Sequence, residues 1–260
     1  VETVLGTTAS DDAVNMLAGG TMAASALETV VGTSGASDAL RLLGAANASV
    51  SAVESVLGSA GTDTVTMLAT GTLNVSSVES VVGVDAAATD IVQMLGGGAM
   101  NLTAVETVLG STGTDSVTML STGTLATSNV ETVLGSSDAG DTLKMLGAGA
   151  TRVSRMESVL GSTGTDTVTL AGGGEVAVSI VETLLGSTAT DSVTMLSGGS
   201  LAASTIESVV GTTGGSDVLR MLGAGTASVS AIESVLGSAG TDSVTMLASG
   251  NLAASSVETL

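Results

Sequence analysis

The chain contains no Cys, Pro, His, Phe, Tyr or Trp among its 260 residues. Without Cys it can form no disulfide bond. Without aromatic side chains, which bury the largest apolar areas, a thick globular core is disfavoured. The common nucleophile and base pairs of enzymes need His or Cys, and every polar residue here is repeated whereas an active site is singular. We therefore expect that the protein is not an enzyme.

Positive charge is scarce, with 5 Lys and Arg residues against 25 Asp and Glu residues and a net charge of −20. Nucleic acids and anionic lipids bind through basic patches, so neither is an expected partner. No apolar run approaches the ~20 residues of a membrane-spanning helix, so membrane insertion is not expected either. The charge instead favours cations as ligands, or serves solubility.

What the sequence does contain is one motif in tandem, as in residues 51–68, SAVESVLGSAGTDTVTML. Its Glu recurs at 2, 28, 54, 79, 106, 131, 157, 182, 207, 233 and 258, and its Asp at 12, 38, 63, 90, 115, 141, 166, 191, 217 and 242. From each Asp to the next Glu is always 16 residues, whereas from Glu to Asp is 9, 10 or 11. Such an array predicts a single continuous solenoid over residues 1–260, with about ten coils of about 25 residues.

The segment after each Asp alternates apolar and polar residues, as in Thr64, Val65, Thr66 and Met67. This period of two predicts a half-buried strand in every coil. Stacked at ~4.8 Å per coil, such strands would form a parallel sheet. The recurring Met is expected in the core, where a flexible side chain fills gaps.

A second alternation follows a Gly-rich turn, as in Leu73, Asn74 and Val75, and predicts another short strand. It leads into Ser or Thr three residues before each of the ten recurring Glu residues from Glu28 to Glu258, which is the capping-box pattern of a helix start. The segment after it is short and rich in Val, Ser and Thr, which favours a strand or a bent corner. The fold is therefore expected to be all-β, with one short helical turn per coil, and hence an α/β solenoid, as the alternative.

Two kinds of repeat alternate along most of the chain. One has a short loop and an outward Thr, whereas the other has a longer loop and a basic or amide residue, namely Arg41, Gln93, Lys144 or Arg220. The alternation fails where two short-loop repeats, those of Asp166 and Asp191, follow one another. The repeating unit is therefore often a pair.

The piece GSAGTDTVT at residues 58–66 resembles the calcium-binding nonapeptide GGxGxDxUx of the repeats-in-toxin family, and VESVLG at 53–58 is similar to the segment preceding it there. The resemblance implies a right-handed parallel β-roll or β-helix on secreted bacterial proteins, with Ca²⁺ held between turns. Carried over to this sequence, it makes Asp63, Asp115, Asp166 and Asp242 metal ligands, together with carbonyl groups of their Gly loops.

Two interpretations of the Asp series stay open. Carboxylates in register on neighbouring coils would repel one another by roughly 1 kcal/mol per pair in water, and a hard cation would relieve this. Alternatively, each Asp caps its own turn by accepting hydrogen bonds from backbone N–H groups.

From these observations we expect a structural repeat protein, extracellular or on a bacterial cell surface, serving as a stalk, filament or surface-layer segment. Both ends of the sequence fall inside a repeat, so the expected partners are further repeats or copies of the chain stacked end to end. The alternative is a calcium-binding module whose folding is driven by Ca²⁺.

Overall fold

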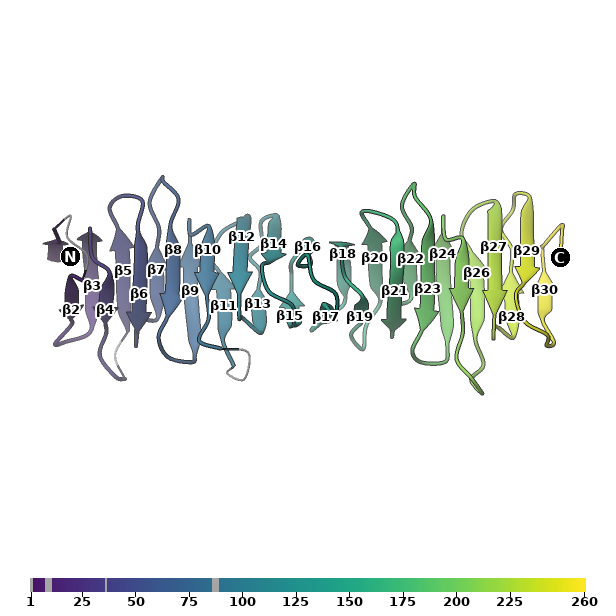
Figure 1. Ribbon diagram of the computed structural model, residues 1–260, viewed down its shortest axis with the longest axis horizontal. Coiled ribbons are helices and arrows are strands. Elements are labelled where there is room, and N and C mark those ends of the chain that lie inside the picture. The colour runs from purple at the N-terminus through teal and green to yellow at the C-terminus, as the bar shows by residue number, and fades with distance from the viewer. Residues whose placement is uncertain (1, 8–10, 36, 86–88) are drawn as a thin grey trace. The chain divides into compact units, whose positions relative to one another are not determined.

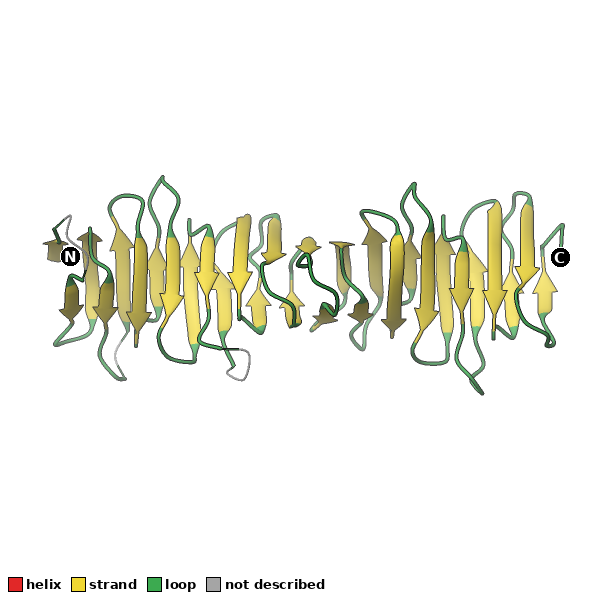
Figure 2. Cartoon of the chain, viewed as in Figure 1, coloured by secondary structure: helices red, strands yellow, loops and turns green. Residues whose placement is uncertain are grey.

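The computed structural model describes residues 2–7, 11–35, 37–85 and 89–260. Within these ranges the chain consists of strands and connecting loops, with no helix (Figure 2). The described part therefore contains no helical membrane span. The all-β expectation is confirmed, and the α/β alternative is wrong.

Each repeat contributes three strands (Figure 1). The strands at the Asp are β2 (Ala13–Asn15), β5 (Asp38–Leu42), β8 (Thr64–Met67), β11 (Ile91–Met94), β14 (Asp115–Met119), β17 (Thr142–Met145), β20 (Asp166–Leu170), β23 (Asp191–Met195), β26 (Val218–Met221) and β29 (Asp242–Met246). The strands that end at the recurring Ser or Thr are β3 (Gly20–Ser25), β6 (Asn47–Ser51), β9 (Thr72–Ser76), β12 (Gly98–Thr103), β15 (Thr124–Ser128), β18 (Gly149–Ser154), β21 (Gly174–Ser179), β24 (Ser200–Ser204), β27 (Gly225–Ser230) and β30 (Ala253–Ser255). The short strands at the Glu are β1 (Glu2–Leu5), β4 (Thr29–Val31), β7 (Ser55–Leu57), β10 (Ser80–Val82), β13 (Thr107–Leu109), β16 (Thr132–Leu134), β19 (Ser158–Leu160), β22 (Thr183–Leu185), β25 (Ser208–Val210) and β28 (Ser234–Leu236).

The strands build two compact units, Val1–Val130 and Glu131–Leu260. In the first unit the odd-numbered strands β1 to β15 lie in sheet A and the even-numbered strands β2 to β14 lie in sheet B. In the second unit β17 to β29 lie in sheet A and β16 to β30 in sheet B. Neighbouring strands of a sheet pair in parallel, as β5 does with β3 and with β7. Consecutive strands therefore belong to opposite sheets, which is the arrangement of a parallel β-solenoid.

The solenoid has about 15 turns of about 17 residues, which corrects the expected ten coils of about 25. The expectation counted one turn per repeat, but each turn uses two strands and each repeat supplies three. A repeat therefore covers one and a half turns, and successive repeats begin on opposite sheets.

This ratio also removes the expected ladder of neighbouring Asp residues. Asp38 pairs in register with Gly20 on one side, and its strand β5 is followed in sheet A by β7 and β9. The next Asp on that sheet, Asp90, precedes β11, three strands further along. The register therefore does not place Asp carboxylates ~4.8 Å apart on neighbouring strands. The repulsion that a bridging cation was expected to relieve is absent.

The core between the two sheets is a stack of aliphatic side chains. In sheet A, Leu40, Val56 and Val75 stand beside one another on three successive strands and are at most 1% exposed. Met67 lies in the core at 6% exposure, as most of the recurring Met residues do, which confirms the core interpretation. Fully burying an aliphatic side chain of this size stabilises the fold by about 1.5–3 kcal/mol relative to exposure, so a thin core without aromatics suffices when it repeats.

The segment before each Glu forms a bent corner. Ser76 ends β9, Ser77 has a φ of 54°, and Glu79 directly precedes β10. The equivalent residue has a φ between 50° and 55° in every repeat, at Ala26, Ala52, Ser77, Ala104, Asn129, Arg155, Ile180, Thr205, Ala231 and Ser256. None is Gly, although the left-handed conformation costs roughly 1–2 kcal/mol for an L-residue, most clearly for the β-branched Ile180. The corner is thus held by its surroundings against a local preference.

The Gly that stands four residues after each of the first ten Glu residues marks the closest approach between turns. A Cβ atom on Gly58 would lie 1.7 Å from the carbonyl oxygen of Ser77 and 2.9 Å from Oδ2 of Asp63. Because the obstacle is backbone, the clash cannot be relieved by a side-chain rotation. The role of this Gly is to let the backbones of two turns cross at close range.

We predict that Gly58→Ala destabilises the protein by about 3 kcal/mol or more, because the added methyl group must displace the neighbouring turn. Gly44→Ala is the matched control, since a Cβ there has no neighbour within 4 Å. Denaturant unfolding of the two variants measures the difference. Equal stabilities would contradict the close approach.

Candidate functional site

The chemistry-bearing residues gather at the corners, in a unit that we call the corner network. In one repeat it consists of Asp38, Thr33 and Glu54 together with the backbone of Gly20. The backbone N–H and the hydroxyl of Thr33 donate to Oδ2 of Asp38 at 2.5 and 2.9 Å, and the N–H of Gly20 donates to Oδ1 at 3.1 Å. Asp38 is 1% exposed, so its charge is stabilised by these donors in place of water.

The Glu completes the network from the following turn. The backbone N–H of Asp38 donates to Oε2 of Glu54 at 2.7 Å, and the same bond joins Asp and Glu in nine repeats at 2.7–2.9 Å. The two residues are always 16 positions apart, which is about one turn of the solenoid. The constant Asp-to-Glu spacing was visible in the sequence and is explained by this bond. The residues between Glu and Asp can vary in number because they form a loop outside it.

The four predicted metal ligands occupy the Asp position of this network. Asp63, Asp115, Asp166 and Asp242 are fully buried, and the Ser four residues earlier donates to Oδ2 of each through its N–H at 2.5–2.6 Å and its hydroxyl at 2.8–2.9 Å. Oδ1 of Asp63, Asp166 and Asp242 accepts a further backbone N–H at 2.8–3.1 Å. The hydrogen bonds required by the turn-capping interpretation are therefore present.

The structure does not bring these four residues together. They belong to repeats separated by at least one other repeat along the chain. Among the described residues there is no group of three or more acidic side chains that could hold a metal ion. Oδ1 of Asp90 and Oδ1 of Asp191 are buried without a hydrogen-bond partner, unlike Oδ1 of Asp63, Asp166 and Asp242. In the Asp191 corner the N–H of Gly174 bonds to the carbonyl oxygen of Thr190 at 3.0 Å.

Hydrogen bonding lowers the pKa of Asp38 below its ordinary value. The main cause is the backbone N–H of Thr33, assisted by the Thr33 hydroxyl and the N–H of Gly20, while burial acts in the opposite direction. The N–H and hydroxyl of Thr7 lower the pKa of Asp12 in the same way. Both carboxyl groups are thus held in the charged form that the corner network requires.

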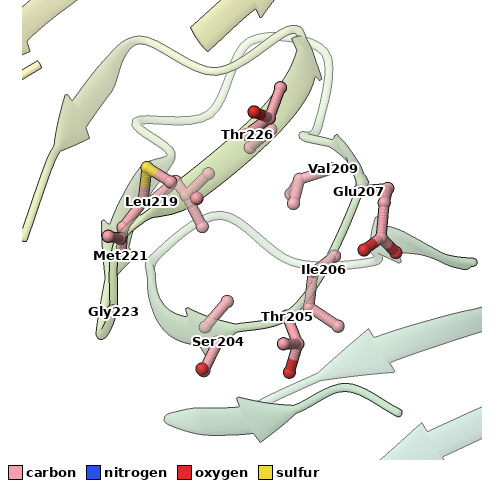
Figure 3. A pocket seen from close by; sticks show the side chains of 13 residues that line it. Ser204, Thr205, Ile206, Glu207, Val209, Leu219, Met221, Gly223 and Thr226 are labelled. Carbon is pink, nitrogen blue, oxygen red and sulfur yellow. The ribbon is translucent and has the colours of Figure 1, made fainter. Parts of the chain in front are cut away.

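Hollows of about 120 to 390 Å³ recur beside the corners. One of about 120 Å³ lies between the corner that contains Thr205 and Ile206 and the strand carrying Leu219 and Met221 (Figure 3). Similar hollows lie at the corners of Glu79, Glu106, Glu157 and Glu182. Because they repeat with the same lining, they are a by-product of the corner geometry, and none has a distinct set of polar groups for a ligand.

Comparison of the chain with protein-family models, curated proteins and solved structures finds no match. The corner geometry and the solenoid fold are therefore the basis for any functional proposal.

The lowered pKa of Asp38 predicts acid sensitivity. Because the folded-state pKa lies below the unfolded value of about 3.9, the network contributes its full stability above about pH 4 and loses it as the pH falls toward the folded-state pKa. Asp38→Asn should cost about 2 kcal/mol at pH 7 and reduce the pH dependence of unfolding between pH 5 and pH 2. The control is Asp138→Asn in an exposed loop, which should leave both unchanged. Identical pH profiles for the two variants would contradict this account.

Proposed function

We propose that the protein is a structural repeat module that builds an extended array by stacking turns, both within the chain and between copies of it. The observation that carries the proposal is the corner network itself. The buried Asp carboxylates accept hydrogen bonds within their corners, and no described residue departs from the repeat to form a singular site. The polar interior is thus devoted to joining one turn to the next.

End-to-end contact between copies would use the strand edges of the first and last turns, because the N–H of the last Asp, Asp242, already donates to Glu258 of the same chain. Each turn offers the next one a parallel strand edge, and once per repeat a backbone N–H of Asp donates to the carboxylate of the Glu 16 residues later. A further turn can therefore be added in the same manner whether the same chain or another copy supplies it. Such a head-to-tail contact propagates as a filament and does not close into a dimer.

The proposed location is extracellular or on a bacterial cell surface, as a stalk, filament or surface-layer segment. It rests on the likeness of residues 58–66 to the repeats-in-toxin nonapeptide and on the high negative charge, which favours solubility. Neither nucleic acid nor a membrane is proposed as a partner.

The purified chain should form linear assemblies that lengthen with concentration, visible by electron microscopy and sedimentation velocity. The matched control is the chain fused at Leu260 to a capping segment rich in Lys and Pro, which blocks pairing at a strand edge. The cap should leave folding unchanged and abolish lengthening. Assembly that is insensitive to the cap, or a monomer at every concentration, would refute axial stacking.

Calcium binding is a second candidate, favoured by the buried Oδ1 atoms of Asp90 and Asp191 that have no hydrogen-bond partner. A cation with oxygen ligands would satisfy such an atom, with Gly-loop carbonyl groups completing its coordination. At the four short-loop residues proposed from the family resemblance, the ion would have to replace the Ser hydroxyl bond to Oδ2. We propose this module as the alternative to a purely structural role.

The calcium alternative predicts a rise in melting temperature with millimolar Ca²⁺ that an equal ionic strength of NaCl does not give. Asp166→Asn should reduce this rise more than Asp141→Asn, because Asp141 follows a longer loop. An equal effect of both salts indicates charge screening and removes calcium from the account.

A further inference from the structure

The outer faces of the sheets differ in charge although the repeats are alike. Because each repeat covers one and a half turns, the two alternating kinds of repeat place their outward residues on opposite sheets. In the first unit, Arg41 and Gln93 face outward from sheet A, whereas the equivalent Thr66 and Thr118 face outward from sheet B.

Sheet B of the first unit therefore has an outer face without charge, which we call the neutral face. The outward positions of its seven strands, β2 to β14, hold Ser, Thr, Asn, Ala and Val only. Each of the other sheet faces carries charge on its strands, with Arg41 on sheet A of the first unit and Arg152 and Arg220 on sheet B of the second. The neutral face is unusual in a chain of net charge −20, since soluble surfaces are commonly a quarter or more charged.

Exposed aliphatic side chains border the neutral face. Leu68 and Leu120 are 50% and 58% exposed at the ends of β8 and β14, and Val84 beyond β10 is 39% exposed. A Leu recurs five residues after the Asp in nine of the ten repeats. Exposed aliphatic residues that recur through an array indicate a surface that contacts a partner rather than one that faces solvent.

No exposed carboxylate lies on the strands of this face. Most Asp carboxylates are buried in the corners, and the Glu carboxylates there accept hydrogen bonds from backbone N–H groups, whereas Asp11 and Asp85 are exposed in loops at the border. Two copies can therefore meet through the strands of their neutral faces without bringing carboxylates of those strands into contact, whereas corner-to-corner contact would oppose like charges.

We propose that the neutral face is a lateral interface that binds the neutral face of a second copy of the chain. The spacing of its aliphatic groups fits this occupant, and the lack of charge on the neutral face favours it over the charged faces of the chain. Leu68 and Leu120 end strands that lie three positions apart in sheet B, or about 14 Å at ~4.8 Å per strand. A partner that contacts both needs the same spacing, which a second copy has by construction. Flat faces of small side chains also interdigitate at the ~10 Å separation of packed sheets.

The interface is small. Seven strands at ~4.8 Å and a width of about 15 Å give roughly 500 Å² per copy, or about 1,000 Å² for the pair, which is near the lower limit for specific association. The contact is therefore weak between isolated chains. It tightens at high salt, where repulsion between the acidic corners is screened.

The absence of Cys allows a direct test with single-cysteine variants. Thr66 lies on β8, the middle strand of the neutral face, and Thr169 has the same repeat position on sheet B of the second unit, paired in register with Arg152. Pyrene-labelled Thr66→Cys should give a concentration-dependent excimer signal in 1 M NaCl at least tenfold above that of labelled Thr169→Cys. Circular dichroism checks that both variants are folded.

A second pair of variants tests the aliphatic contacts in the Thr66→Cys background. Replacing Leu68 and Leu120 by Asp should remove the signal, whereas Leu222→Asp, at an exposed position of the second unit, should not. Adding the Lys- and Pro-rich cap at Leu260 should leave the signal intact, so that loss of axial stacking and loss of the lateral interface are distinguishable. Equal signals at Thr66 and Thr169, no signal at millimolar protein, or insensitivity to the two Asp substitutions would overturn the proposal.

Discussion

The hydrogen bond between the backbone N–H of each Asp and the carboxylate of the Glu 16 residues later fixes the length of one turn. The Asp carboxylate in turn fixes the loop that precedes it, by accepting hydrogen bonds from the N–H and hydroxyl of a Ser or Thr such as Thr33. Two acidic residues per repeat thus define where a turn starts and ends. The apolar alternation then needs only to face inward, and Val, Leu and Met are sufficient for the core.

The same arrangement explains how acidic residues can recur in every repeat without strong repulsion between their carboxylates. Each carboxylate interacts chiefly with backbone donors of the corner and stands about three strands from its nearest equivalent on the same sheet. In a low-dielectric interior, such fixed N–H donors replace the water that a charged group would otherwise require. Forming these corners has a cost in the backbone. One residue of every corner adopts the left-handed conformation, and the position four residues after the Glu has room only for glycine.

Much of the local structure was predictable from the sequence. The strand after each Asp and the one before each Ser or Thr followed from alternation, as at Val65 and Met67 or Leu73 and Val75. The number of turns was not predictable in this way, because the segment that forms the third strand, as at residues 55–57, left a strand, a bent corner and a short helical turn open. Counting it changes one turn per repeat into one and a half.

The candidate site was also only partly visible. The invariant 16-residue spacing was visible in the sequence, but the hydrogen bond that explains it joins one turn to the next and leaves no local sequence pattern. Turn capping was one of the two interpretations that the sequence left open for the Asp positions, and the hydrogen bonds that it requires are present. The sheet on which each Asp lies depends on the number of turns per repeat. The arrangement of the carboxylates was therefore not predictable while that number was unknown.

The ratio of three strands per repeat to two per turn has a consequence for how such a chain can change its length. Gaining or losing one repeat rotates everything that follows by half a turn and exchanges the two faces, so a row of side chains would continue on the wrong side. Gaining or losing two repeats adds or removes three whole turns and keeps every row aligned. The repeats of Asp166 and Asp191, which follow each other without alternation, are what a single-repeat event would leave. The basic residue three positions after the Asp of a long-loop repeat faces outward from sheet A before this point, as at Lys144, and from sheet B after it, as at Arg220.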